Sequence, residues 1–327
     1  MRPLRLVPDN TSIRFMRGHF AGLIVSAVLS IASIVLFFYP GLNYSIDFLG
    51  GVVVELRMPA PTDPAAIRTA FGGLGFGDAR VQEFGSPRDF LIKLDRQAAG
   101  ENSKKAIDGM LAGKFPGSEI RRLEQVGARV SDELFHKGLL AVSLSFVGVL
   151  IYIWFRFDWQ FGVGVVGTLL LDITKTVGFF AVTRIEFDLN SVAAIMLLIG
   201  YSVTDKIVVY DRIRENLRKD KSTPLRELID RSINQTLGRT VVTSLTVLLS
   251  IVPLAVIGGE AIRGFALAII FGIVIGTSSS IFIASPILLF LGQRRLRPGL
   301  ALAGAQPKAP SPGVSARGSV AGAAGPS

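Results

Sequence analysis

Four ionisable side chains interrupt stretches that are otherwise apolar: Asp172, Lys175, Asp205 and Lys206. An Asp or Lys at the centre of a membrane-spanning helix costs about 2.5–3.5 kcal/mol on insertion scales, so it needs a partner or a water-filled path. A carboxylate in a partly dry site, beside a cation that can approach or withdraw, can exchange a proton near neutral pH. These residues therefore indicate ion or proton handling inside a membrane.

Helix geometry limits which of these charges can neutralise one another. Asp172 and Lys175 are three residues apart and share a helical face, so they can form a structural pair. Asp205 and Lys206 are adjacent and project about 100° apart around a helix. We therefore expect the partner of Asp205 to come from another segment, and Arg239, at the entrance to a later apolar stretch, is the candidate. Asp172 is a candidate proton relay, and its alternative role in a purely structural pair stays open.

The elements that carry these residues are predicted to span a membrane. The chain has 327 residues, is 50% hydrophobic and has a mean hydropathy of +0.49, which is typical of an integral membrane protein. A helix needs about 20 mainly apolar residues to cross the bilayer. Six stretches meet this requirement: 20–39, 137–155, 161–182, 189–210, 240–258 and 265–291. We predict a polytopic α-helical membrane protein with six transmembrane helices.

The basic residues predict its orientation. They cluster in three segments, 1–19, 211–239 and 292–327, which lie on one side if the six spans alternate. The positive-inside rule then places both termini in the cytoplasm. Counted at 1.5 Å per residue, Asp205 lies about 8 Å and Asp172 about 16 Å from that surface. The last segment is rich in Pro, Gly, Ala and Ser and is predicted to be disordered.

Residues 40–136, between the first two spans, are predicted to form a small periplasmic α+β domain. "GGVVVELRM" (50–58) is rich in β-branched residues and predicts a strand. Alternating segments on either side of Gly85-Ser86-Pro87 predict a hairpin. Helical patterns and a final strand complete the order β-α-β-β-α-β, the ferredoxin-like arrangement. The acidic residues of this domain are spread along the chain and form no catalytic constellation.

Several functional classes are disfavoured. The chain has no cysteine, which excludes disulfides and cysteine metal sites. We find no phosphate-binding loop, no His-rich metal motif and no Ser/His/Asp arrangement, so we expect neither an enzyme nor a bound cofactor. The net charge of +10 lacks the motif or aromatic interleaving of a nucleic-acid binder.

Three segments closely resemble the SecF family, membrane subunits of the bacterial Sec protein-export machinery. They are "NYSIDFLGG" (43–51), the segment 172–216, which contains "GYSVTDKIVVYDRIREN", and "NQTLGRTVVTSL" (234–245). The resemblance implies a partner, SecD, and together the two resemble the twelve-span core of proton-driven RND exporters. Such a complex joins the SecYEG channel in the bacterial inner membrane. It uses the proton-motive force to help draw the translocating polypeptide out.

The resemblance also implies roles for individual residues. An acid at the position of Asp205 and an arginine at that of Arg239 are required for proton flow in the family. Many members carry Asn where this chain has Thr204, and Thr or Ser where it has Lys206. These two residues, with Lys175, are candidate modulators of the proton affinity of Asp205. The expected coupling ion is the proton, and sodium stays an alternative because some relatives use it.

Three residues of the first motif are expected to be structural: Asp47, Gly50 and Gly51. The glycines indicate a tight turn at the membrane surface. Two other functions stay open. Half of an RND-type small-molecule exporter would use the same chemistry, but such exporters carry both halves and larger external domains. A structural subunit without ion flow would tolerate the loss of Asp205.

Overall fold

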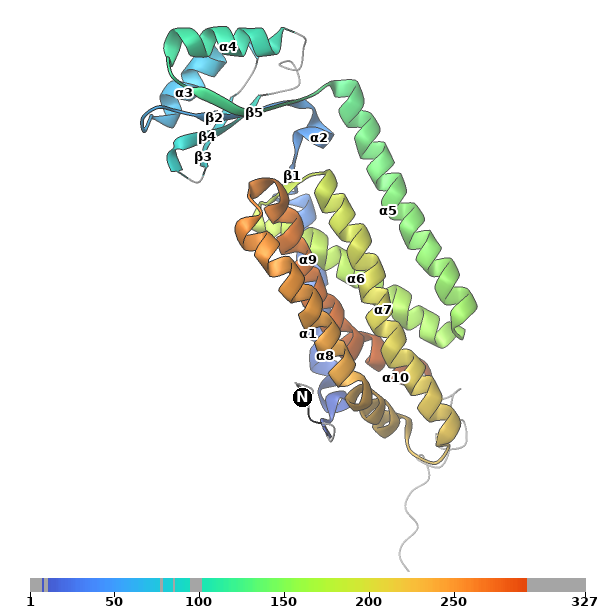
Figure 1. The fold of residues 1–327 in the computed structure, drawn as a ribbon. Coiled ribbons are helices and arrows are strands. Elements are labelled where there is room, and N and C mark those ends of the chain that lie inside the picture. Colours follow the sequence, from blue (N-terminus) through green and yellow to red (C-terminus); the bar gives the residue numbers. More distant parts are fainter. Residues whose placement is uncertain (1–7, 9–10, 77–78, 85, 95–101, 293–327) are drawn as a thin grey trace, which may run out of the picture.

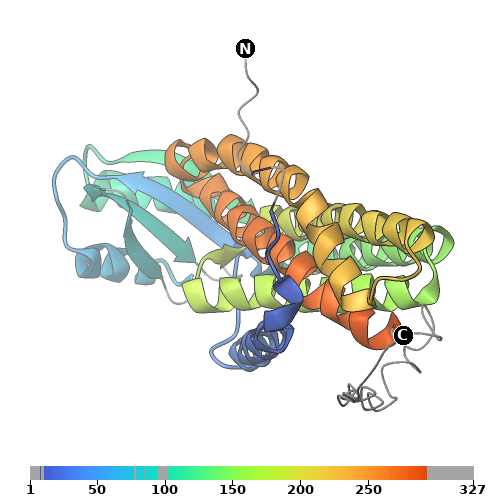
Figure 2. The ribbon, with the colours of Figure 1, turned by 90° about the horizontal axis from the view of Figure 1, so that it is seen from below.

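The computed structural model describes residues 8, 11–76, 79–84, 86–94 and 102–292 (Figure 1). The predicted disordered tail, apart from Gly292, lies outside the described residues. A bundle of long helices carries a small sheet-containing domain at one end. Figure 2 shows that this domain lies beside the end of the bundle and not within it.

Six helical segments of the described chain are long and apolar enough to cross a membrane, which confirms the predicted polytopic fold. The last segment is continuous but changes its helical winding at η3, a stretch of π-helix. In chain order the segments are α1 (His19–Phe38), α5 (Ala128–Arg156), α6 (Trp159–Thr183), α7 (Leu189–Lys219), α8 (Leu225–Ile257) and α9 (Glu260–Ser279) with η3 (Ser280–Ala284) and α10 (Ser285–Gly292).

Two of these helices continue well past the predicted spans. The basic segment 211–239 is not a separate region, because α7 runs on to Lys219 and α8 already begins at Leu225. Their extensions bury Ile213 and Ile229 in the same core as the bundle. Similarly, α5 begins within the predicted external domain. Helical packing thus continues beyond the most apolar residues.

The helices differ in how far they are buried. About half of the apolar window of α6, and slightly more of the windows of α7 and of the last segment, lies inside the protein. The windows of α1, α5 and α8 are 17%, 6% and 11% buried, so these helices expose most of their surface. The bundle therefore has a central group, α6, α7 and α9, and three peripheral helices.

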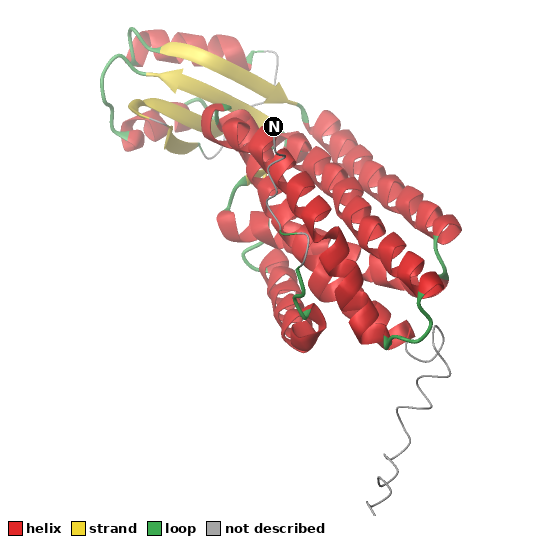
Figure 3. Cartoon of the chain, turned by 60° about the horizontal axis from the view of Figure 1, so that its bottom comes forward, coloured by secondary structure: helices red, strands yellow, loops and turns green. Residues whose placement is uncertain are grey.

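The external domain has the predicted topology. Its sheet has the strand order β3-β4-β2-β5, and all neighbouring strands are antiparallel (Figure 3). One apolar core joins Val54 of the sheet to Ile67 and Ile107 of the two helices, so both helices cover the same face. In chain order the elements are β2 (Gly51–Arg57), α3 (Pro64–Gly72), β3 (Arg80–Phe84), β4 (Ser86–Leu94), α4 (Ser103–Lys114) and β5 (Glu119–Val126).

A second, two-stranded sheet joins the domain to the bundle. β1 (Asn43–Tyr44) pairs in parallel with β6 (Glu186–Phe187), the turn between α6 and α7. The short helix α2 (Ile46–Leu49) follows, and its Asp47 accepts a hydrogen bond of 3.1 Å from the Leu189 amide at the start of α7. Burial raises the pKa of Asp47, and the Leu189 amide opposes that effect.

Gly50 and Gly51, the two glycines of the first motif, come directly after α2. Gly50 and Gly51 have φ of 72° and 138°, values that favour glycine over any residue with a side chain. They turn the chain from α2 into β2. The contacts of this motif therefore lie at the junction between the domain and the bundle.

Candidate ion site within the helical bundle

Close helix packing brings the intramembrane charges together. Asp172 comes from α6, Asp205 and Lys206 come from α7, and all three side chains are more than nine-tenths buried. Gly272 lets α9 approach α7, because a Cβ atom there would lie 2.3 Å from the Leu198 side chain. Such small residues are a common means of close approach between membrane helices. The same approach brings the serines at the end of α9 to the acidic side chains.

Asp172 is paired with Lys206, not chiefly with Lys175 as the spacing on α6 suggested. The Lys206 Nζ lies 2.8 Å from Asp172 Oδ2, and the Lys206 side chain is fully buried. The same carboxylate oxygen accepts hydrogen bonds from the Ser202 hydroxyl at 2.8 Å and the Ser279 hydroxyl at 2.6 Å. Lys175 Nζ is 3.9 Å from the other oxygen, Oδ1. One turn of α7 and the end of α9 thus surround a single carboxylate oxygen.

Lys175 also borders a separate cavity. This cavity, of about 340 Å³, lies between α1 and the last helical segment. Its other lining side chains include Ser26, Ser278 and Phe282. Lys175 therefore reaches between the Asp172 cluster and the inner face of α1.

Asp205 has a different environment, although it is the neighbour of Lys206 in the chain. Its Oδ2 accepts a hydrogen bond of 2.5 Å from the Ser280 hydroxyl. The Thr240 hydroxyl lies near the carboxylate but makes no hydrogen bond of ordinary geometry in the described chain. Within that chain, no ion pair to Asp205 is found. The carboxylate of Asp205 is thus held by hydroxyl groups alone.

Two adjacent serines connect the two acids. Ser279 donates to Asp172 and Ser280 donates to Asp205, so one short stretch of backbone contacts both carboxylates. This stretch is where α9 passes into the π-helix η3. π-Helical turns are frequent at functional sites, and this one begins at Ser280, the residue that donates to Asp205.

Arg239 does not pair with Asp205 within this chain, which corrects the expected pairing. On α8 it is Thr240 that faces the interior, with 2% of its surface exposed. Arg239 is one position away, about 100° around the helix, and its side chain is exposed. Among the described residues it makes no ion pair.

Thr204 is also outside the cluster. Its side chain is exposed, and its hydroxyl donates to the Gly200 carbonyl of the same helix at 2.8 Å. It does not contact the acid that follows it. Thr204 therefore does not hold the carboxylate of Asp205 directly in this structure.

A small cavity adjoins the free side of Asp172. It has a volume of about 10 Å³, close to the space that one water molecule needs, and it is lined by Asp172, Thr176 and Ser202 among apolar residues. The buried Oδ1 of Asp172 has no hydrogen-bond partner among the described residues.

Within the described part of the chain there is no group of three His, Cys, Asp or Glu residues that could hold a metal ion.

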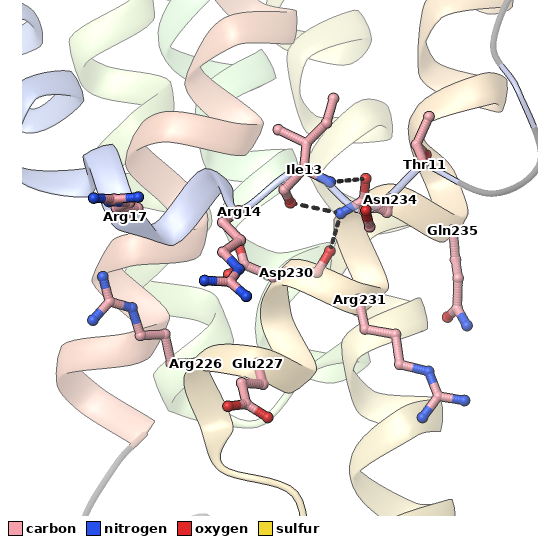
Figure 4. A pocket seen from close by; sticks show the side chains of 11 residues that line it. Thr11, Ile13, Arg14, Arg17, Arg226, Glu227, Asp230, Arg231, Asn234 and Gln235 are labelled. Atoms are coloured by element: carbon pink, nitrogen blue, oxygen red, sulfur yellow. Dashed lines mark hydrogen bonds between the residues drawn. The ribbon is translucent and has the colours of Figure 1, made fainter.

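A larger cavity lies away from these acids, between the N-terminal segment and α8 (Figure 4). It has a volume of about 950 Å³. Asn234 exchanges two hydrogen bonds with the backbone of Ile13, and Asp230 accepts from the Met16 amide at 2.8 Å. Four arginines and two acids line it: Arg14, Arg17, Arg226, Arg231, Glu227 and Asp230. These contacts join two of the basic segments at one end of the bundle.

The serines and Thr240 are the site residues that the sequence analysis did not identify. A signal for two of them was present, because Ser279 and Ser280 belong to the run "TSSS" (277–280) inside an apolar stretch. Ser202 lies three residues before Asp205, and so on the same face of the helix. Hydroxyls near an intramembrane acid are candidate donors to it.

The sequence matches two protein families. Residues 107–294 match the C-terminal region of the protein export membrane proteins SecD and SecF. Residues 35–58 match the SecD/SecF GG motif, which includes Gly50 and Gly51. The first match alone covers more than half of the chain.

Curated relatives agree with this assignment. The protein translocase subunit SecF of Rickettsia rickettsii is 41% identical over 297 residues, which is 90% of this chain and 96% of the relative. The protein translocase subunit SecDF of Brucella abortus is 44% identical over 293 residues, which is 89% of this chain and 39% of that longer relative.

A solved structure has the same fold. SecDF from Thermus thermophilus, a translocon-associated membrane protein, superimposes with a TM-score of 0.79 at 34% identity. The alignment covers 88% of this chain and 39% of the solved chain. A second SecDF structure, in a super-membrane-facing form, gives a TM-score of 0.63 at 32% identity.

Proposed function

Because this chain belongs to the SecD/SecF family of protein-export membrane proteins, we propose that it is the SecF-like subunit of a complex that uses the proton-motive force to assist protein export through SecYEG. The observation that carries the proposal is Asp205, a carboxylate buried in the bundle and bonded to Ser280 but to no cation. A carboxylate whose partner is a neutral hydroxyl can exist with or without a proton inside the bundle, and access to water lets that proton exchange. A group that alternates between these two states carries protons.

Asp172 is assigned a second role. Its negative charge is compensated by Lys206, so it holds the middle of α6 and of α7 together with the end of α9. The exchange of a proton at Asp205 releases or restores the Ser280 contact, which lies one residue from the Asp172 cluster. The contact between Ser280 and Asp205 thus links the protonation of Asp205 to the position of the π-helix η3. Such a link would couple proton exchange to a movement of that helix.

We propose SecD as the partner that covers α8. Arg239 is exposed on a helix whose neighbouring surface is apolar, including Val242 at 45% and Leu249 at 66% exposure. An arginine facing lipid is costly, so a second membrane subunit that offers it an acid would be favourable. The solved SecDF chain is much longer than this one, which supports such a second half. The SecYEG channel and the translocating polypeptide are the further proposed partners.

The proposed location is the bacterial inner membrane, with both termini in the cytoplasm and the external domain in the periplasm. The basic side chains near the start of α1 and the start of α8 meet at one end of the bundle. The external domain lies at the opposite end (Figure 1). This distribution is the one that the positive-inside rule favours for a cytoplasmic basic end.

The test is export of a secretory precursor in cells that depend on Asp205→Asn as their only copy. We expect export to fall at least about tenfold below that of the wild type, while the amount of protein and its co-purification with SecD stay unchanged. Asp47→Asn is the matched control, because it removes an acid at the junction and keeps a side-chain oxygen that can accept from the Leu189 amide. Full export by an assembled Asp205→Asn complex would favour the structural-subunit alternative.

A further inference from the structure

The ammonium group of Lys206 is enclosed by oxygen atoms from two helices besides its carboxylate. Its Nζ lies 2.8 Å from Asp172 Oδ2, 2.5 Å from Ser202 Oγ, 3.3 Å from the Ser202 carbonyl and 3.0 Å from Ser279 Oγ. The two hydroxyls each accept from Lys206 and donate to Asp172. The four oxygens therefore form a shell around a single positive charge.

This set of atoms is the kind that binds a monovalent metal cation. Hard cations prefer carboxylate, carbonyl and water oxygens. In membrane transporters, sodium sites are built from helix carbonyls and side-chain oxygens within the bundle. The small cavity beside Asp172 gives room for one further water ligand. An ammonium group and Na+ carry the same charge, so one can take the place of the other.

We propose that Lys206 is a tethered cation that occupies a latent site for a monovalent metal ion such as Na+, and that its presence restricts the intramembrane site to protons. The site consists of Asp172, Ser202 and Ser279. Because the ammonium is part of the chain, its effective concentration at the site is high, and free sodium competes poorly with it.

The charges of the cluster agree with this assignment. When Asp205 is ionised, Asp172 and Asp205 contribute two negative charges, and Lys175 and Lys206 contribute two positive ones, all buried. Removal of the Lys206 charge leaves the bundle with one excess negative charge at the oxygen shell. One bound monovalent cation restores neutrality. Asp205 offers no comparable shell, since Ser280 is the one hydroxyl of the described chain at ordinary hydrogen-bond distance from it.

The consequence for ion choice during export rests on the proposed function, whereas the binding site itself does not. Sodium binding can be measured on the purified full-length chain in complex with its co-expressed partner, without any export assay. Loss of coupling in Asp205→Asn tests the proposed function separately. A sodium site in Lys206→Met and normal export in Asp205→Asn would therefore leave this inference standing while overturning the function.

The experiment measures the melting temperature of the wild type and of Lys206→Met in NaCl and in choline chloride at equal ionic strength. At a sodium concentration about one hundred times the dissociation constant, we expect Na+ to raise the melting temperature of Lys206→Met by about 5 °C. The wild type should show no difference between the two salts. Binding of radioactive 22Na+ to Lys206→Met should reach one ion per chain.

The double variant Asp172→Asn/Lys206→Met is the matched control, because it removes both charges and should fold without responding to sodium. Equal sodium responses in the wild type and Lys206→Met, or none in either, would overturn the proposal. If Lys206→Met cannot be purified in folded form even in NaCl while the double variant can, then Na+ does not bind to Asp172 in place of the lysine, and the proposal is wrong. A sodium response that persists in the double variant would also place the ion elsewhere.

Discussion

The sheet-containing domain buries Val54 and Ile67 and, apart from Asp89, leaves the charged side chains of its described residues at least partly exposed. The bundle buries Asp172, Asp205 and Lys206 and exposes large apolar side chains. Both regions are well packed, but the bundle places its costly groups where a soluble protein would place leucine. The cost of burying the two acids is offset in part by hydrogen bonds, which Ser279 donates to Asp172 and Ser280 donates to Asp205.

The contrast separates stability from function. The domain can be understood as a sheet covered by two helices, since every core contact serves packing. The bundle contains a cluster that packing does not require, because leucine or alanine at these positions would insert into a membrane at lower cost. We therefore propose that the bundle handles the ion and that the domain is the part that reaches out of the membrane.

The largest effect on stability is expected from a charge removed in the bundle. Lys206→Met leaves Asp172 buried with only the more distant Lys175, at 3.9 Å, and breaking a buried pair typically costs about 3–5 kcal/mol. We expect a loss near the upper part of this range in a sodium-free buffer, measured by reversible denaturation in detergent. Asp172→Asn/Lys206→Met should recover most of it. A double variant as unstable as Lys206→Met would show that packing, not charge, is what Lys206 supplies.

A smaller loss is expected from an apolar side chain removed in the domain. Ile67 is fully buried between α3 and the sheet, and Ile→Ala substitutions in cores cost about 2–5 kcal/mol. We expect about 3 kcal/mol for Ile67→Ala, confined to residues 51–126. Hydrogen exchange should show faster exchange in the domain and unchanged protection in α6 and α7. Equal loss of protection in both regions would show that the two do not unfold separately.

A weaker effect is expected at the contact between the two regions. Lys93 of β4 lies 2.6 Å from Glu186 at the turn between α6 and α7, and both side chains are partly exposed. Pairs of this kind contribute about 0.2–1 kcal/mol. Lys93→Ala should therefore loosen the domain slightly without unfolding it, seen as faster proteolysis near residues 40–50. Lys137→Ala, which removes an exposed pair within α5, is the control.

A similarly small effect is expected at the turn between α7 and α8. Asp220 accepts hydrogen bonds from the backbone and hydroxyl groups of Ser222 and Thr223, and these donors hold its pKa well below its usual range. A carboxyl whose folded pKa is lowered stabilises the protein above its unfolded pKa of about 3.9, and the benefit disappears as pH falls through the folded value.

We therefore expect Asp220→Ala to lower the melting temperature by about 2 °C at pH 7, where the wild-type carboxylate is ionised. The difference from the wild type should shrink as the pH falls below about 4. Melting curves across this pH range check both statements. A difference that is constant with pH would show that the turn depends on Asp220 through its shape and not through its charge.

Much of the fold could be predicted because its signals are local. Apolar runs of sufficient length indicated the six spans, and alternation around Gly85-Ser86-Pro87 indicated the hairpin that the structure shows between β3 and β4. The end of a helix was harder to predict. α7 and α8 extend well beyond the apolar run because residues such as Ile213 and Ile229 pack against other helices, and that packing is not local.

The residues of the site were predictable in kind but not in pairing. The identity of the buried charges followed from their surroundings in the sequence. Which charge meets which depends on the rotation of each helix about its axis, and a rotation of one residue exchanges Arg239 for Thr240. The pairing of Asp172 with Lys206 joins positions 34 residues apart. Ser279 and Ser280 were missed because serines in membrane helices commonly bond their own backbone, as Ser33 does here.

We propose that Asp205 carries protons. The most direct test of this role is proton uptake into proteoliposomes that contain this chain with SecD, driven by a membrane potential and measured with a trapped pH-sensitive dye. The wild type and Asp47→Asn should conduct protons alike, and Asp205→Asn should reduce the flux to the level of empty liposomes although the complex assembles normally. Proton uptake by Asp205→Asn at the wild-type rate would contradict a proton-carrying role for Asp205.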